Sequence, residues 1–381
     1  MEAARGFCCG SAARRMPGMI APAKVGPADA RAAKTIRSPW RMAGRRFSRN
    51  ILAVVGAVVI VILLGACFGS LPWTMAPVVP PGSDKAPATA GAAAMGAAAD
   101  GGGADSESRR VPRYDAKDFD QVKKAPRWAD GAPGDKPLGW AYWMGTDTLG
   151  RDLRARFFMG GAISLSIGLC SALVAVLIGT AVGLIAGYAG GRVDALLMRV
   201  VDVLYGLPYI LLVILMRVAL VPLVTKTSER QGLPVMWANF LVLLVGIGAV
   251  SWLTLARVVR GQVMSLREQP FVEAARALGF GGARILGRHI LPNLVGTIVV
   301  YGTLTVPAAV LSESFLSFLG LGIQPPLPSW GNLAADGMEA LNPVLVRWWL
   351  IAWPCAGLSL ALLALNFVGD GLREAIDPKG S

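Results

Sequence analysis

Residues 273–293 read EAARALGFGGARILGRHILPN. This charged, glycine-punctuated stretch lies between two apolar blocks, Val235–Ala256 and Leu294–Leu311. A hydrocarbon core about 30 Å thick is crossed by roughly 20 helical residues, and both blocks come close to that length. Because a charged connection between two such blocks is typical of a chain that crosses a membrane repeatedly, the stretch predicts an all-α polytopic membrane protein.

The composition supports the same class. Of 381 residues, 54% are hydrophobic and only 16% are charged, which is far more apolar than an ordinary soluble domain. The net charge of +13 would suit nucleic acid, but the basic residues cluster beside apolar runs and do not alternate with aromatic side chains, so we predict no nucleic-acid partner. The five cysteines lack metal-binding or redox spacing, and we predict neither a metal site nor a disulfide framework.

Counting apolar runs along the chain predicts about six membrane spans. Residues 193–224 can be divided in more than one way, so five or seven spans also fit the sequence. The predicted spans are Ile51–Gly69, Ala162–Tyr188, Leu204–Leu223, Val235–Ala256, Leu294–Leu311 and Val344–Val368.

Basic residues set the predicted orientation. Residues 1–50 carry eleven arginines and lysines against only Glu2 and Asp29, which predicts a cytoplasmic N-terminus. No periodic pattern precedes Trp40, so we expect a basic, disordered cytoplasmic tail over residues 1–50. Ile51–Gly69 is longer than a typical signal-peptide core and lies too far along the chain, which favours an uncleaved first span.

The remaining boundaries follow from the spans. Residues 70–161 are predicted to be extracytoplasmic, and residues 75–103 within them are dominated by alanine, glycine and proline, a composition typical of a flexible linker. Aromatic residues between 109 and 143 predict a small packed element or one lying along the membrane interface. The other predicted parts are a core of five spans at 162–369, with a cytoplasmic loop at 257–293, and a cytoplasmic tail at 370–381.

Small residues recur at every fourth position of the second span. This spacing places them on one helical face, where a neighbouring helix can approach closely. We therefore predict a tightly packed helix and assign these residues no contact with any ligand. They are Ser171, Ala175, Gly179, Gly183, Gly187 and Gly191.

The stretch at 273–293 predicts a helix, a turn and a second helix. Pro270 suits the first turn of a helix, and Gly279 suits the left-handed residue that ends it. The second helix is expected over 283–291, where Pro292 breaks it or begins the next element. The apolar side chains form a surface that suits the groove of a cytoplasmic partner, although a plain loop whose arginines follow the orientation rule also fits. They are Phe271, Ala274, Leu278 and Phe280.

The order EAA, three residues, glycine and then HILP resembles the EAA loop of ABC-importer permeases, whose coupling helix sits in a cleft of an ATPase subunit. Histidine within HILP is expected in the peptide-importer branch of that family. The resemblance therefore implies ATPase coupling for one set of residues. They are Glu273, Ala274, Ala275, Gly279, Phe280, His289, Leu291 and Pro292.

Three further stretches resemble the C-type permease subunit of dipeptide and oligopeptide importers. They are GTDTLGRDLRARFFMGG at 145–161, LSESFLSFLGLGIQPPLPSWG at 311–331 and NFVGDGLREAIDP at 366–378. The resemblance covers residues 40–381, and the N-terminal tail and the insertion near 75–105 depart from it. It implies the ABC type I importer permease fold in a bacterial cytoplasmic (inner) membrane, with both termini in the cytoplasm.

The family implies a heterodimer with a second permease subunit, two cytoplasmic ABC ATPase subunits and an extracytoplasmic solute-binding protein. The sequence has no GxxxxGK[ST] phosphate loop, so we predict that ATP and magnesium bind to the partner ATPases and that this chain has no catalytic residue or cofactor of its own. Peptides are the first expectation for the cargo, with nickel chelates or another small solute as alternatives.

Two other classes were weighed. An ion-coupled secondary carrier would use Asp202 and Glu313 as coupling carboxylates, but the inverted repeat that such carriers often show is not evident. A membrane-embedded enzyme is disfavoured because the sequence has no GxSxG or HExxH motif and only one histidine.

Polar residues near the predicted span ends carry further expectations. Glu313 lies near the outer end of the fifth span, where an ionisable group is costly unless it is paired or faces water. It is expected either to line the translocation path, with Ser312 and Ser314 beside it, or to pair with an arginine. Asp202 is expected to pair with Arg199 at the end of the bundle.

Three charged residues precede the second span. Asp147, Arg151 and Asp152 are expected either to form salt bridges that fix the outer end of this span or to contact the binding protein. His289 is expected to be an interface or packing residue, because a lone imidazole lacks the further ligands that a metal site needs.

Overall fold

The computed structural model describes residues 39–79, 110–126, 128, 142–231, 235–341 and 347–376, and gives only the backbone of residues 39–41, 229–231 and 235–238. The chain divides into two units, Met1–Met42 and Ala43–Ser381. The description below concerns the second unit. The prediction of a disordered tail over residues 1–50 is wrong for residues 39–49, which form a helix, and the predicted linker at 75–103 includes a short strand at Pro77–Val78. The rest of both segments, residues 1–38 and 80–103, lies outside the described residues.

Within the described residues, six helical stretches are long and apolar enough to cross a membrane, as predicted. They are Ile51–Thr74, Leu153–Ala189, Tyr209–Ser228, Asn239–Leu266, Gly282–Phe318 and Trp349–Ile376. The helices are α2 (Pro39–Arg49), α3 (Ile51–Gly69), α4 (Leu71–Thr74), α5 (Leu153–Ala189), α6 (Gly191–Tyr205), α7 (Tyr209–Gln231), α8 (Val235–Leu266), α9 (Pro270–Ala277), α10 (Gly282–Ile285), η5 (Leu286–Ile290), α11 (Leu291–Phe318), α12 (Trp330–Glu339) and α13 (Trp349–Ile376).

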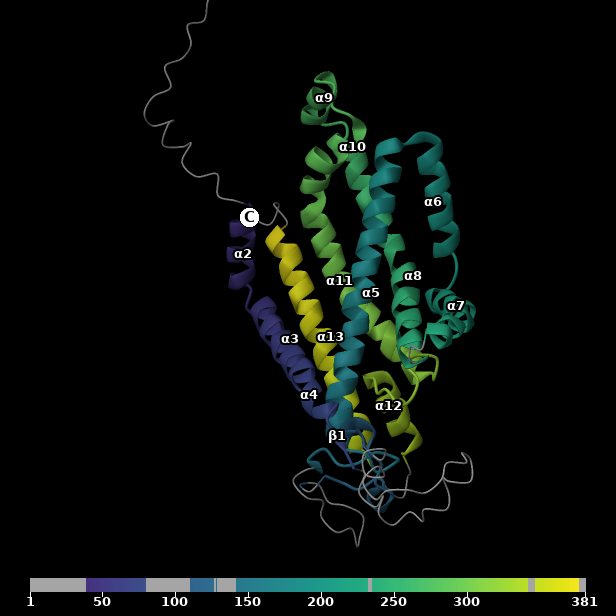
Figure 1. The fold of residues 1–381 in the computed structure, drawn as a ribbon. Coiled ribbons are helices and arrows are strands. Elements are labelled where there is room, and N and C mark those ends of the chain that lie inside the picture. Colours follow the sequence, from purple (N-terminus) through teal and green to yellow (C-terminus); the bar gives the residue numbers. More distant parts are fainter. Residues whose placement is uncertain are drawn as a thin grey trace, which may run out of the picture. The chain divides into compact units, whose positions relative to one another are not determined.

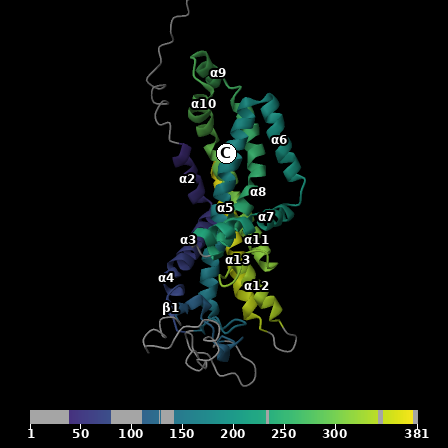
Figure 2. The same cartoon turned by 45° about the vertical axis from the view of Figure 1, so that its right-hand side comes forward.

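The core of this unit is built on α5. Helices α8 and α11 pack along it, and all three lie side by side in both views of the fold (Figures 1 and 2). A Cβ added at Gly183 would lie 2.7 Å from the backbone oxygen of Ala256 on α8, and at Gly187 it would lie 2.7 Å from Cβ of Val263. The spacing of small residues thus correctly predicted a close contact, because only glycine leaves room for the α8 backbone there.

The prediction of one span over Leu204–Leu223 is wrong in its boundaries. Helix α6 ends at Tyr205 and α7 begins at Tyr209, so the chain turns at Gly206, Leu207 and Pro208. Proline disfavours a helical conformation for the residue before it, which explains why the apolar run is interrupted there.

The fifth span is longer than predicted. Helix α10, the π-helical turn η5 and helix α11 form one helical run from Gly282 to Phe318. Pro292 lies in the first turn of α11, directly after the wider π-helical turn η5, and does not interrupt the run. The second helical piece of the EAA-like stretch is therefore the start of the membrane helix.

A small layer covers the end of the unit where α5 begins. Strands β1 (Pro77–Val78) and β2 (Val111–Pro112) pair antiparallel, and η2 (Arg113–Asp115) and η3 (Phe119–Gln121) follow. Tyr114 is buried, and the ring of Trp128 lies 6.1 Å from that of Trp353 on α13. The aromatic segment thus includes packed side chains, as predicted from its composition.

Two features of the C-terminal third differ from the prediction. Helix α12 was not expected, and it begins with a capping box between Ser329 and Asn332. Helix α13 continues to Ile376, beyond the predicted end of the last span at Val368 and into the predicted tail. The predicted start of that span at Val344 and the tail beyond Ile376 lie outside the described residues.

Candidate functional site

The EAA-like stretch forms a short helix with well-defined ends. Helix α9 has Pro270 in its first turn and ends at Ala277, with Leu278 as the C-cap, after which Gly279 has φ +79°. The N–H of Phe280 donates to the carbonyl of Ala275 at 3.2 Å, and that of Gly279 to the carbonyl of Arg276 at 2.9 Å. This pair of bonds is a Schellman motif, so the predicted role of Gly279 as the left-handed terminating residue is confirmed.

The two faces of α9 differ in burial. Val272 and Ala275 are 0% and 3% exposed and pack against residues of α8, α10 and α11. Phe271 and Leu278 point away and are 42% and 75% exposed, with Ala274 on the same side. A helix that is anchored on one face and leaves large apolar side chains uncovered on the other presents a surface for a partner.

Side chains tie this segment to the end of α5. Arg267, which follows α8, donates through Nη1 to the carbonyl of Gly187 at 3.1 Å. The guanidinium of Arg276 lies over the ring of Tyr188 at 5.8 Å, and a Cβ added at Gly282 would lie 3.0 Å from the same ring. These contacts join the segment around α9 to α5 and to the start of the long run at Gly282.

The other residues implicated by the resemblance gather near α9. The ring of His289 stacks on that of Phe280 with centroids 6.1 Å apart, and the guanidinium of Arg284 lies 5.6 Å from the Phe280 ring. The stack is a packing contact of the kind expected for His289, and its place at an ATPase interface stays a prediction. Glu273 and Pro292 are exposed, whereas Ala275 lies on the buried side, where it helps to hold the helix in place.

Glu313 lies in a buried cluster of hydroxyl groups. Its carboxylate accepts hydrogen bonds from Ser317 at 2.7 Å and Ser314 at 3.3 Å, and it also bonds Ser164 of α5 and Ser329 before α12. The carboxylate is fully buried. Within the described residues the expected ion pair with an arginine is not formed, because the carboxylate meets serines, and a place for Glu313 on the translocation path stays a prediction.

Ser312 faces a different space. It lines a cavity of about 680 Å³ between α8, α11 and the turn that joins α6 to α7. Among the described residues that line it, no side chain is charged. The polar groups are hydroxyls, supplied by Tyr205, Tyr209, Ser251, Thr254, Tyr301, Thr305 and Ser312. Of the three residues expected on a path, Ser312 alone lines this cavity, since Glu313 and Ser314 are buried.

An ion-pair network fixes the start of α5. Asp147 accepts from Nε of Arg151 at 2.7 Å and also pairs with Arg156. Nη1 of Arg151 forms a second ion pair, with Oδ1 of Asp115 at 3.2 Å. Nη2 of Arg156 pairs with Oδ2 of Asp336 on α12 at 3.7 Å. The expectation of structural salt bridges is confirmed for Asp147 and Arg151, while Arg156 and Asp336 are members that the sequence analysis missed.

Asp152 has a local role. Its side chain caps α5 by accepting from the backbone N–H of Arg154 at 2.9 Å. Burial raises the pKa of Asp152, while the charge of Arg154 and the capping N–H groups oppose this shift. Asp152 therefore caps the N-terminus of α5, and its ion pair with Arg154 at 4.0 Å stays within the first turn of that helix.

The expected pair between Asp202 and Arg199 is not formed. Asp202 pairs with Arg257 of α8 at 2.8 Å, and the same guanidinium lies 4.2 Å from the centroid of the Tyr205 ring. Asp194 pairs with Arg260 one turn further along α8, at 2.6 Å for Nη2. Both bonds join α6 to α8, which the sequence alone could not indicate because the partners are 55 and 66 residues apart.

Comparisons with known proteins give a consistent result. The family described as binding-protein-dependent transport system inner membrane component matches residues 179–380. The N-terminal TM domain of oligopeptide transport permease C matches residues 38–87.

Individual relatives extend over most of the chain. The chain is 44% identical over 238 residues to the dipeptide transport system permease protein DppC of Bacillus subtilis, covering 62% of this chain and 69% of that protein. It is 35% identical over 363 residues to the oligopeptide transport system permease protein OppC of the same organism, and this match covers 95% of this chain and 97% of that protein. A solved structure of the MetNI methionine ABC transporter in an inward-facing conformation aligns with a TM-score of 0.43 and 20% identity, over 57% of this chain and 94% of that one.

Proposed function

Because the chain belongs to the family of inner-membrane components of binding-protein-dependent transport systems, we propose that it carries peptides across the membrane and is driven through the exposed face of α9. The chain is the permease of an ABC importer and is not an enzyme, since ATP hydrolysis belongs to a separate subunit. ATPase and binding-protein partners follow from this family in general.

Peptide is the cargo class that the relatives support. The names of the two Bacillus subtilis relatives specify dipeptide and oligopeptide transport. The cavity beside Ser312 is consistent with this cargo, because its hydroxyl groups can bond peptide amides and its lining carries no charge that would select for one side chain.

The partners of the proposed assembly are a second permease chain, two ABC ATPases that bind ATP and magnesium, and an extracytoplasmic binding protein. Pairing with a different permease is proposed from the C-type resemblance. The end of the bundle that holds α9 is cytoplasmic in this proposal, together with both termini. The end that holds α12 faces the binding protein.

The single observation that carries the coupling proposal is the division of α9 into a buried and an exposed face. Val272 and Ala275 fix the helix to the bundle, so Phe271 and Leu278 are free to enter a cleft of the ATPase. Closure of the two ATPases on binding ATP would then carry α9 with them. The bond from Arg267 to Gly187 and the continuous run from Gly282 would pass the movement to α5 and α11, which line or support the path.

Co-purification from detergent-solubilised membranes tests this role. Leu278→Asp places a charge on the exposed face without uncovering the core, because Leu278 is already 75% exposed. Removing a central apolar contact of an interface typically costs enough to lower the recovered ATPase by about tenfold or more. ATP-dependent peptide uptake should fall in parallel.

Met338→Asp is the matched control, because Met338 is 54% exposed on α12 at the other end of the bundle. It should retain the ATPase. If Leu278→Asp retains as much ATPase and uptake as the wild type, α9 is not the docking element.

A further inference from the structure

Arg217 lies in the middle of a membrane span. It is on α7, within the candidate span Tyr209–Ser228, and its nearest neighbours along the helix face are apolar. An arginine keeps its charge in such surroundings, and an ionisable residue there marks a functional site by default because its burial in an apolar layer is costly.

The guanidinium has no partner among the residues that the structure describes. It takes part in no hydrogen bond or ion pair with them, and its Nη1 atom is buried without an acceptor. Arg217 as a whole is half-buried, and Nη1 is the guanidinium atom that is both buried and without an acceptor among the described residues. Leaving a buried charged donor unpaired is unfavourable, so the site suits an acceptor supplied from elsewhere.

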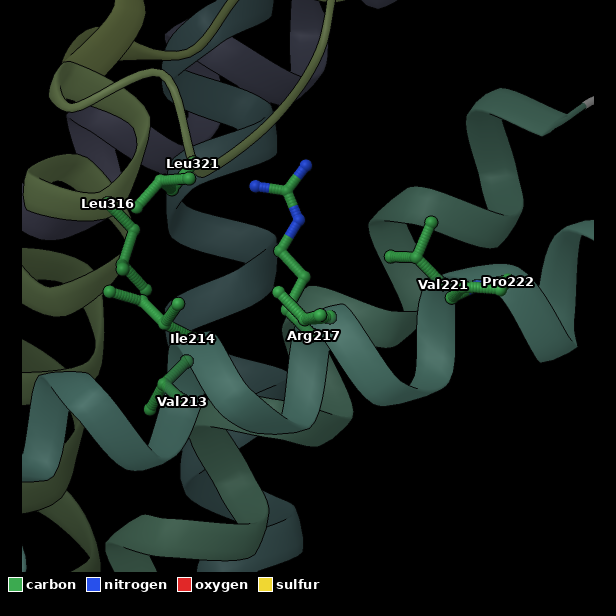
Figure 3. Close-up of a pocket in the computed structure, with 8 residues that line it drawn as sticks. Val213, Ile214, Arg217, Val221, Pro222, Leu316 and Leu321 are labelled. Carbon is green, nitrogen blue, oxygen red and sulfur yellow. The ribbon is translucent and has the colours of Figure 1, made fainter.

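The side chain points into a small cavity (Figure 3). The cavity measures about 220 Å³, and apart from Arg217 its lining is apolar: Val213, Ile214, Val218, Val221, Pro222, Leu316 and Leu321. Figure 3 shows the Arg217 side chain extending away from the α7 backbone, with Leu321, Leu316 and Ile214 on one side of it and Val221 and Pro222 on the other. Apolar walls strengthen the attraction between the guanidinium and an anion that enters the cavity.

The shape of the site restricts the ligand. The planar fork of a guanidinium matches the two oxygens of a carboxylate. Because pockets for whole small molecules measure about 300–1,000 Å³, this one suits only the end of a larger ligand. Apolar walls beside the charge favour a carboxylate that adjoins an apolar side chain.

We propose that Arg217 binds the terminal carboxylate of the transported peptide, with the last side chain of the peptide against Leu316 and Leu321. This inference rests on the proposed function, since it takes the cargo to be a peptide. The terminal residue can enter a cavity of this size, whereas an internal residue would require the chain to pass through it. One arginine without a second basic side chain in the lining binds weakly enough for the cargo to move on.

The test uses the complete transporter in vesicles with its binding protein. The probes are trialanine with a free carboxylate and trialanine amide. Uptake is measured with the binding protein saturated by each probe, so that its own preference does not contribute. The wild type should take up the free acid about tenfold faster than the amide, and Arg217→Gln should lower the rate for the free acid to that for the amide. Arg217→Lys should restore part of the difference.

Arg199→Gln is the matched control, because it removes an exposed charge from the neighbouring helix α6 outside the cavity. It should leave the ratio of the two rates unchanged. If Arg217→Gln keeps the wild-type ratio of the uptake rates for the free acid and the amide, the inference is overturned. It is also overturned if purified Arg217→Gln loses the second permease chain, because the guanidinium would then pair with a carboxylate of that chain. ATP-dependent uptake of either probe by the wild type reports separately on the proposed function.

Discussion

Glu313 joins three helices through hydroxyl groups. Its carboxylate, on α11, receives hydrogen bonds from its own helix and also bonds Ser164 of α5 and Ser329 at the start of α12. The N–H of Trp330 adds a bond of 3.3 Å to the oxygen of Ser164. A buried polar cluster of this kind stabilises a fold only when each member has a partner.

Two replacements of Glu313 should therefore differ in their effect on the melting temperature. Glu313→Gln retains the size of the side chain and can both donate to and accept from the serines, so we expect a melting temperature close to that of the wild type. Glu313→Ala leaves buried hydroxyl groups without partners, at a cost of about 1–3 kcal/mol. Thermal unfolding of the purified chain in detergent measures both, and equal melting temperatures for the two variants would show that the cluster does not hold these helices together.

Asp336 should make stability depend on pH. Burial first, and then the negative charges of Asp147 and Glu339, raise the pKa of Asp336 from its ordinary value of 3.8 to about 6 against the opposing charge of Arg151. The folded state thus favours the protonated acid. Its contribution to stability is fully present below about pH 3.8 and is lost as the pH rises through about 6.

Asp336→Asn removes this dependence. We expect the wild type to lose melting temperature between pH 5 and pH 7 relative to Asp336→Asn, measured in the same detergent. A larger loss in the variant than in the wild type would contradict the sign of the shift.

At the scale of elements, some features could be predicted from the sequence and others could not. The packing of α5 could be predicted from its glycines, because a four-residue spacing places them on one face of the helix, where a neighbouring helix can approach closely. The ends of α9 follow from Pro270 and Gly279, whose backbone preferences are local. Helix α12 was missed because its capping box stands on Ser329 and Asn332 within a stretch of prolines that indicates a loop. The partners of Asp202 and Glu313 could not be predicted, because they depend on tertiary packing. Arg217 was missed because a single charge does not disturb the apolar pattern of α7.

The contact between α5 and α8 gives a direct test of packing. Gly183→Ala places a Cβ 2.7 Å from the backbone oxygen of Ala256, and overpacking of this kind typically costs about 1–3 kcal/mol. Gly65→Ala on α3 is the matched control because a Cβ there meets nothing within 4 Å. We expect a lower melting temperature for Gly183→Ala and an unchanged or slightly higher one for Gly65→Ala. Equal melting temperatures for the two variants would show that the small-residue face of α5 is not a close contact with α8.

At the scale of the whole molecule, six candidate spans among the described residues and the family match make the chain a membrane permease, and cysteine labelling tests its proposed orientation. With the five cysteines replaced by alanine, Leu278→Cys and Phe119→Cys place single thiols at side chains that are 75% and 72% exposed. In cells that lack the partner ATPases, so that Leu278 is not covered, we expect a membrane-impermeant maleimide to label Phe119→Cys in intact cells and Leu278→Cys only after permeabilisation. The reverse pattern would invert the proposed topology.

The central claim is that ATP hydrolysis by a partner drives transport through this chain. The measurement that tests it most directly is uptake of a labelled peptide by vesicles that contain the purified complex and the loaded binding protein. We expect uptake to require ATP on the side of α9 and to persist when ionophores collapse the proton and sodium gradients. Uptake that follows either gradient without an ATPase in the vesicles would contradict the claim.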